Sequence, residues 1–181
     1  MEQRAHRYVI ALGSNRWHHR HGRPRSIIAA ALEILAQEGL GVLRASSVVE
    51  SRPLGPSRRT YANAVALIET GLAPEDLLEC LKHIEQRFGR RAGGRRWTAR
   101  VLDLDIVLWD FGPWASPRLL IPHPAYRQRE FVLCPMRLWG NEARDPLSGL
   151  TPAHLHARLT RPRPTPKPRL APGLTDRTKG P

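Results

Sequence analysis

The order in which strand-like and helix-like apolar patterns follow one another is the feature that most constrains the fold. Short apolar runs that alternate in facing predict strands, and apolar stripes spaced three and four residues apart predict helices. The predicted elements are, in order, a strand over 8–12, a helix over 26–38, strands over 42–50 and 61–69, a helix over 74–88 and a strand over 101–108. This β-α-β-β-α-β order predicts an α+β, ferredoxin-like fold with helices packed on an antiparallel sheet.

The predicted helix boundaries support this division of the chain. Ser26 is a candidate cap for the first helix, and Gly39 follows its last apolar residue. Pro74 suits the first position of the second helix, where its fixed φ and missing N–H do no harm. The acidic residues Glu75 and Asp76 follow in the first turn, where the helix dipole favours negative charge.

The composition changes at Thr160. From there to the last residue, prolines alternate with six arginines and lysines, and Asp176 is the only acidic residue. Such a segment cannot bury a core, so we predict one domain over 1–159 and a disordered, basic, Pro/Arg-rich tail over 160–181. Six basic residues minus one acidic residue give the tail five of the net positive charges, out of +13 for the whole chain.

The net charge indicates an anionic partner, since charge of one sign attracts nucleotides, nucleic acids and anionic surfaces. No segment is long and apolar enough to predict a membrane span. The two cysteines, Cys80 and Cys134, lack any motif spacing and are expected to be buried free thiols of a reducing compartment. We therefore predict a cytoplasmic protein without a membrane partner.

Two aspartates interrupt the last predicted strand. Asp103 and Asp105 would share one face and lie about 7 Å apart along the strand, where like charges repel. A divalent cation would offset that repulsion. The opposite face is predicted to carry Leu102, Leu104, Ile106 and Leu108. Because a dense run of arginines precedes the pair, the segment 90–108 predicts a polyphosphate site that uses Mg²⁺.

Several short motifs, taken together, resemble those of one enzyme family. They are Leu12-Gly13-Ser14-Asn15, Ser51-Arg52-Pro53-Leu54-Gly55-Pro56, Tyr61-Ala62-Asn63-Ala64, Arg96-Trp97, Arg100-Val101-Leu102-Asp103-Leu104-Asp105, Ile121-Pro122-His123-Pro124 and Arg129-Glu130-Phe131. In this order and with these residues, the chain resembles 6-hydroxymethyl-7,8-dihydropterin pyrophosphokinase of folate biosynthesis. The resemblance runs from about residue 8 to about residue 157.

The resemblance implies transfer of pyrophosphate from ATP to the hydroxymethyl group of the pterin, which leaves AMP. It implies ATP as co-substrate and two Mg²⁺ ions held by Asp103 and Asp105. Arg90 and Arg100 would join the two aspartates as catalytic residues.

The resemblance also assigns residues to each substrate. The implied ATP-binding residues are Glu85, Arg96, Trp97, Arg118, His123 and Arg129. The implied pterin-binding residues are Ser51, Leu54, Tyr61, Asn63, Trp97 and Phe131. Aromatic rings would stack on the flat pterin, and the Asn63 amide would read its polar edge.

Other functions compete with this one. A nucleic-acid-binding module is the alternative, because ferredoxin-like sheets host RNA-binding domains and the chain is basic; the Gly-Phe-rich strand typical of such domains is absent from the sequence. A P-loop kinase lacks support, since no Gly-x-x-x-x-Gly-Lys-Ser/Thr segment occurs. An inactive relative stays open because Thr98-Ala99 replaces the family's usual Gly-Pro. We expect small-molecule substrates, no specific nucleic acid and a monomer.

Overall fold

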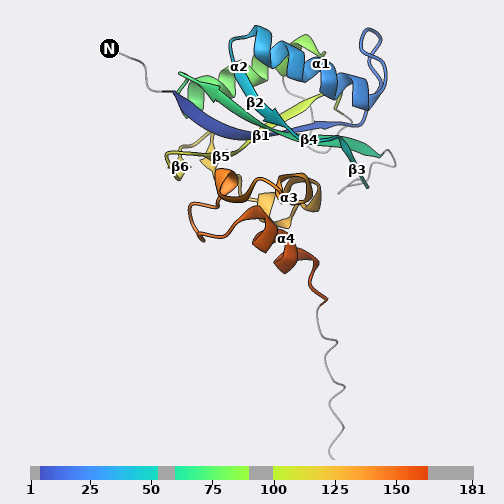
Figure 1. Ribbon diagram of the computed structural model, residues 1–181. Coiled ribbons are helices and arrows are strands. Elements are labelled where there is room, and N and C mark those ends of the chain that lie inside the picture. The colour runs from blue at the N-terminus through green and yellow to red at the C-terminus, as the bar shows by residue number, and fades with distance from the viewer. Residues whose placement is uncertain (1–4, 53–59, 90–99, 163–181) are drawn as a thin grey trace, which may run out of the picture.

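The structure is a computed structural model that describes residues 5–52, 60–89 and 100–162. Its main elements form a sheet with helices on both faces (Figure 1). In chain order they are β1 (His6–Ser14), α1 (Pro24–Gln37), β2 (Gly41–Ala45), β3 (Val49–Ser51), β4 (Tyr61–Thr70), α2 (Pro74–Arg87), β5 (Asp103–Trp109), β6 (Trp114–Ala115), β7 (Leu120–Ile121), α3 (Glu130–Met136) and α4 (Pro152–Thr160). Two 3₁₀ turns, Tyr126–Gln128 and Gly140–Ala143, flank α3.

The strand order confirms the ferredoxin-like prediction. The main sheet runs β2-β4-β1-β5, β3 also pairs with β4, and every pairing is antiparallel. Helices α1 and α2 cover one face, whereas α3 and α4 cover part of the other (Figure 1). Among the described residues, no helix combines the length and apolar character needed to cross a membrane.

Two predicted elements differ in their boundaries. The first helix begins at Pro24 instead of Ser26, because Pro24 occupies the first helical turn, where its fixed φ is favourable. The single strand predicted over 42–50 is split into β2 and β3. Ser46 stands at the break, where its N–H donates to the Val65 carbonyl and its Oγ accepts the Val65 N–H. The side chain of Ser46 thus replaces a regular ladder bond.

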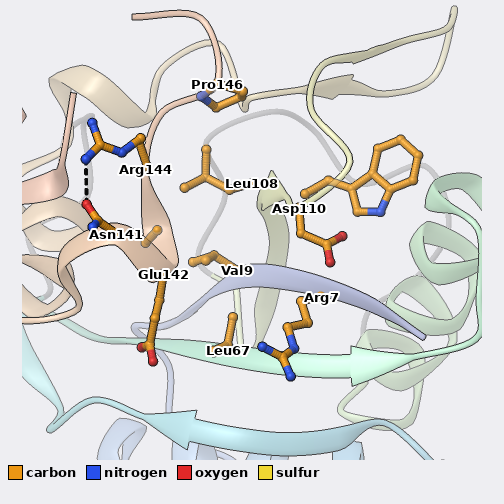
Figure 2. Close-up of a pocket in the computed structure, with 11 residues that line it drawn as sticks. Arg7, Val9, Leu67, Leu108, Asp110, Asn141, Glu142, Arg144 and Pro146 are labelled. Carbon is orange, nitrogen blue, oxygen red and sulfur yellow. Dashed lines mark hydrogen bonds between the residues drawn. The ribbon is translucent and has the colours of Figure 1, made fainter. Parts of the chain in front are cut away.

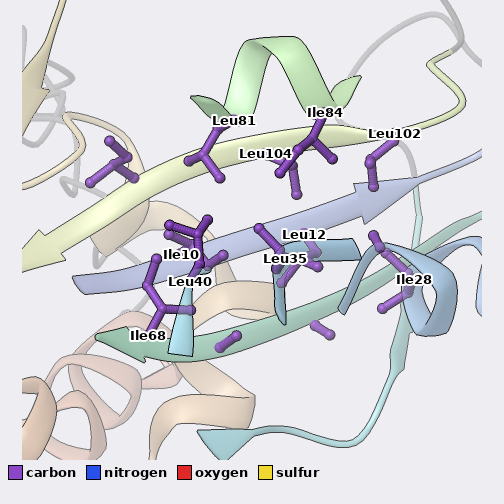
Figure 3. Packing of buried hydrophobic residues seen from close by; sticks show 14 of the residues in the cluster. Ile10, Leu12, Ile28, Leu35, Leu40, Ile68, Leu81, Ile84, Leu102 and Leu104 are labelled. Carbon is purple, nitrogen blue, oxygen red and sulfur yellow. The ribbon is translucent and has the colours of Figure 1, made fainter. Parts of the chain in front are cut away.

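The larger core lies between the sheet and the first two helices. Tyr8, Ile10 and Leu12 point to this side from β1, and buried leucines and isoleucines of α1 and α2 pack on them (Figure 3). A second core on the opposite side contains Val9 and Ala11 together with residues of α3 and α4. Burying an aliphatic side chain contributes about 1.5–3 kcal/mol, so these apolar faces hold both helical layers on the sheet.

A bulge in β5 corrects one prediction about facing. Val9 lies opposite Leu108 while its neighbour Ile10 lies opposite Ile106, so Val107 is an extra residue in β5. Leu108 therefore belongs to the core on the α3/α4 side, and not to the same face as Leu104 and Ile106. A strict alternation cannot foresee such an insertion.

Candidate active site

The polar end of the α3/α4 face brings together the residues singled out from the sequence. On β1, Gly13 lies between Asn63 of β4 and Asp103 of β5, and Ala11 lies between Val65 and Asp105. Residues directly opposite one another share a face, so both aspartates and Asn63 project to the same side. The register thus confirms that the two aspartates share one face. Because Gly13 carries no side chain, it leaves room between Asn63 and Asp103.

Each carboxylate of the pair contacts a nearby cation. An Arg100 guanidinium nitrogen donates to Asp103, and Arg129 Nη1 donates to Asp105 Oδ2 at 3.1 Å. His123 Nε2 lies 3.8 Å from the same Asp105 oxygen. All these side chains are partly exposed, between 22% and 30%. The two arginines offset the repulsion between the aspartates and remain accessible to a ligand.

His123 is held in one tautomer. Its backbone N–H donates to the Val107 carbonyl, and its ring Nδ1 accepts the Ala125 N–H at 3.1 Å. The proton of the neutral ring is therefore on Nε2, the nitrogen that faces Asp105. Burial lowers the pKa of His123, although the charge of Asp105 opposes this shift. A neutral ring with an Nε2–H donor suits contact with a phosphate oxygen.

Glu85 supports the aspartate strand from the opposite face of the sheet. Its side chain is fully buried, and Oε1 accepts the Leu104 N–H at 2.8 Å and the Lys82 ammonium at 2.9 Å. Burial raises the pKa of Glu85, and Lys82 opposes that shift. Leu104 lies between the two aspartates in sequence, so Glu85 fixes the backbone that carries them. Glu85 is therefore placed to influence ATP binding indirectly, through β5. Its direct contact with ATP stays a prediction.

Asn15 is a residue of this site to which the sequence assigned no role. It is 2% exposed; its N–H donates to the Arg100 carbonyl at 3.2 Å, and its Oδ1 accepts the Arg100 N–H at 3.0 Å. These two bonds join the end of β1 to the residues that lead into β5. The Leu12-Gly13-Ser14-Asn15 motif was the one sign in the sequence that Asn15 could matter. The partner of Asn15, Arg100, is 85 residues away along the chain, so the motif could not predict the contact.

Ser51, Tyr61 and Asn63 form the side of the site predicted to bind the pterin. Ser51 lies opposite Tyr61 in the β3/β4 pairing, and Asn63 Nδ2 donates to Ser51 Oγ at 2.9 Å. Burial raises the pKa of the Tyr61 hydroxyl, and the charge of Asp103 raises it further. Tyr61 thus lies near enough to the carboxylate pair for the charge of Asp103 to act on its hydroxyl.

Phe131 joins the site from α3. The Arg129 guanidinium carbon lies 5.9 Å from the centre of its ring. Phe131 is partly buried and packs against the core on the α3/α4 side. The residue predicted to stack on the pterin is therefore next to a cation predicted to bind ATP.

The family model of 7,8-dihydro-6-hydroxymethylpterin-pyrophosphokinase (HPPK) matches residues 9–139 of this chain. The chain belongs to the HPPK family. It is 43% identical over 129 residues to a 2-amino-4-hydroxy-6-hydroxymethyldihydropteridine pyrophosphokinase of Haemophilus influenzae, covering 70% of this chain and 77% of that protein. The equally named protein of Pseudomonas aeruginosa is 39% identical over 132 residues, covering 72% and 78%. That of Synechocystis is 35% identical over 150 residues, covering 82% and 74%.

The HPPK match spans every site residue predicted from the sequence, and it gives no support to the nucleic-acid-binding alternative. In the described part of the chain, Arg118 pairs with Glu79 of α2 instead of with a predicted site residue: its guanidinium donates to Glu79 at 2.9 Å, and both side chains are well exposed. Four predicted residues lie outside the described residues. They are Leu54, Arg90, Arg96 and Trp97.

The donor set of this HPPK site fits Mg²⁺. Carboxylate oxygens are the ligands that Mg²⁺ prefers, and the ion is commonly held by one or two carboxylates plus substrate phosphates. Within residues 5–52, 60–89 and 100–162, no group of three or more His, Cys, Asp or Glu side chains could hold a metal ion. A pair of aspartates with arginines around it therefore suits an ion that arrives with a nucleotide.

A pocket of about 320 Å³ lies elsewhere on the same face (Figure 2). Val9 and Leu108 line it, and these residues are at the opposite end of the β1/β5 pairing from Gly13 and Asp103. Its polar lining includes Arg7 and Arg144, which already bind Glu69 and the Gly149 carbonyl, respectively. Of the predicted HPPK site residues that the structure describes, none lines this pocket.

Proposed function

We propose that this chain transfers pyrophosphate from ATP to 6-hydroxymethyl-7,8-dihydropterin, giving AMP and the pterin diphosphate. The observation that carries the proposal is the aspartate pair, with Arg100 and Arg129 beside it, adjoining the strip of Ser51, Tyr61 and Asn63. One side of such a site can hold a triphosphate, and the other can hold a flat heterocycle. The HPPK family match supports pairing these two ligands.

The cations of the site would bind the triphosphate. Arg100 and Arg129 present planar guanidinium forks, which match phosphate oxygens as well as carboxylates. His123 would donate its Nε2–H to a phosphate oxygen. Asp103 and Asp105 would hold Mg²⁺, two ions in our proposal, whose charge would stabilise the negative charge that develops on the attacking and leaving oxygens. Arg90 and Arg96, in the sequence that precedes β5, would add further positive charge.

The pterin would lie between aromatic rings. Tyr61 and Phe131 would supply the stacking faces, and Trp97 would add a further contact. Ser51 fixes the Asn63 amide by accepting from Nδ2, which leaves Oδ1 on the side of Gly13. There Oδ1 can accept a hydrogen bond from a ring N–H.

The reaction follows from bringing the two ligands together. The hydroxymethyl oxygen attacks the β-phosphorus, the bond between that phosphorus and the bridging α–β oxygen breaks, and AMP leaves. The protein contributes position and charge, which are the main sources of catalysis in phosphoryl transfer. We further propose that the enzyme acts as a monomer in the cytoplasm.

Product analysis tests this proposal. The full chain would be incubated with ATP, Mg²⁺ and 6-hydroxymethyl-7,8-dihydropterin, and the nucleotides would be separated by chromatography. We expect AMP in amounts equal to the pterin consumed, and none when the pterin or Mg²⁺ is left out. ADP as the product, or AMP that forms equally well without the pterin, would contradict the proposal.

A further inference from the structure

An ion pair between the fully buried Asp145 and the partly exposed Arg127 ties the segment that carries His123 and Arg129 to the chain beyond α3. Asp145 is 0% exposed, and Arg127 grips it with two hydrogen bonds, from Nε at 2.6 Å and from Nη2 at 2.8 Å. Asp145 also accepts the Leu147 N–H at 3.0 Å and the Ser148 hydroxyl at 2.8 Å. Its carboxylate is therefore well satisfied, and its hydrogen bonds give the Arg127 side chain a fixed position.

Placing a carboxylate at a buried position is energetically unfavourable compared with an apolar side chain. Taking the Asp145 carboxylate out of water has a large desolvation cost, and well-packed apolar residues often stabilise a fold equally well. Burial opposes the charged form of Asp145, yet the bonds from Arg127, Leu147 and Ser148 keep its pKa well below the ordinary range. The pair stays ionised and directional, which suits a role in orientation.

The pair grips the chain between two residues of the site. Arg127 belongs to the 3₁₀ turn Tyr126–Gln128, which follows His123 and precedes Arg129. The Tyr126 N–H donates to the His123 carbonyl, and the Arg129 N–H donates to the Tyr126 carbonyl, each at 3.1 Å. The Tyr126 ring is buried, and the Arg127 guanidinium stacks on it at 5.0 Å. Holding Arg127 therefore holds the backbone on both sides of the turn.

We propose that Asp145 is a positioning residue, which acts through Arg127 to keep Arg129 and His123 directed at Asp105. The inference rests on the proposed function, because it takes Arg129 as an ATP-binding cation. Asp145 lies outside the residues 9–139 that match the HPPK family model, and it was not among the predicted site residues.

A double-mutant cycle of Asp145→Asn and Arg129→Gln tests the inference. Small displacements of a positioning group can lower rates greatly, so we expect Asp145→Asn to lower kcat/KM for ATP about 10- to 100-fold. The KM for the pterin should change less. In the Arg129→Gln background, adding Asp145→Asn should lower the rate much less, because the residue that it positions is already gone.

Loss of stability is controlled with Leu35→Ala. Leu35 is buried on the other side of the sheet, so this variant should melt at a lower temperature while keeping its ATP kinetics when assayed folded. If Asp145→Asn does not fold at the assay temperature, Arg127→Lys replaces it in the same double-mutant cycle. Lysine keeps the positive charge but loses the paired hydrogen bonds to Asp145. Normal ATP kinetics in these variants, or a full additional loss on top of Arg129→Gln, would overturn the inference.

The failure of the proposed function would look different. In that case the unmodified chain itself would form no AMP with the pterin. Calorimetric titration with Mg²⁺-ATP would then replace kinetics as the readout of the same cycle. We would expect weaker ATP binding by Asp145→Asn and no further weakening in the Arg129→Gln background; unchanged or additive affinities would overturn the positioning role.

Discussion

Tyr61 and Phe131 reach the candidate site from different elements, Tyr61 from β4 and Phe131 from α3. If their rings stack on the pterin, Tyr61→Ala and Phe131→Ala should weaken pterin binding by about 1–3 kcal/mol, by analogy with base stacking on aromatic side chains. ATP binding should change less. Calorimetry with each ligand separately measures both effects, and Tyr61→Phe, which keeps the ring, is the matched control. Equal losses for both ligands would indicate damage to the fold instead.

Asp145 also makes stability depend on acid pH. Its ordinary pKa is 3.8; burial would raise this, but the bonds from Arg127, Leu147 and Ser148 hold the pKa in the folded protein well below it. A carboxylate with a lowered pKa contributes stability that is fully present above its unfolded pKa and is lost as pH falls through its folded pKa. Asp145→Asn should therefore melt below the unmodified protein near pH 7, and the gap should narrow below about pH 4. Thermal melts across this range would show it, and a gap that stays constant would refute the assignment.

Single residues of the site differ in how far the sequence could predict them. Asp103 and Asp105 were predicted to share a face because strand alternation is local, and the register bears this out. The Asn15–Arg100 and Arg127–Asp145 contacts join residues 85 and 18 positions apart. Such pairings depend on how the strands and turns come together in space, which no local pattern encodes.

At the scale of elements, the end of β1 and the start of β5 act as one unit. Asn15 joins them through two hydrogen bonds to the Arg100 backbone. We expect Asn15→Ala to reduce turnover about tenfold through displacement of Arg100, and to reduce the free energy of unfolding by about 1 kcal/mol.

A matched control for Asn15→Ala is Ser46→Ala. Ser46 makes a similar side-chain bond to the Val65 N–H, at 3.1 Å, where β2 leaves β4. Its loss should lower stability by a comparable amount and leave turnover unchanged. Thermal melts and steady-state rates on both variants separate the two roles. If Asn15→Ala and Ser46→Ala behaved alike in turnover, Asn15 would have no special part in the site.

The elements themselves show where sequence patterns succeed and fail. Apolar periodicity predicted six elements in the right order, because each helix and strand buries a continuous stripe. The break at Ser46 and the bulge at Val107 were not predicted. Both depend on how each strand pairs with its neighbour, so they become visible only when the sheet is assembled.

For the molecule as a whole, the topology followed from element order, since a β-α-β-β-α-β chain that buries its helices on one face has few ways to pair its strands. The layer of α3 and α4 on the opposite face was not foreseen as a layer. Its segments are short, and their apolar residues gain a common core only by packing on Val9, Ala11, Val65 and Leu67.

The predicted boundary at residue 160 can be tested by truncation. Removing the residues after Thr160 keeps α4 whole and deletes six basic residues and one acidic residue. Turnover at physiological salt should be unchanged, because the sequence of the deleted segment predicts no packed structure. At low ionic strength the shorter chain should capture ATP more slowly, since five net positive charges are gone. A large loss of turnover at physiological salt would show that the segment belongs to the domain.

The central claim is that pyrophosphate transfer takes place at Asp103 and Asp105, and the turnover of Asp103→Asn and Asp105→Asn tests it most directly. Each carboxylate is paired with a partly exposed arginine, and such pairs contribute little to stability, so both variants should melt within a few degrees of the unmodified protein. Turnover should fall by orders of magnitude in each, because a carboxylate proposed to hold Mg²⁺ would be lost. Near-normal turnover in both folded variants would contradict the claim and place the reaction elsewhere.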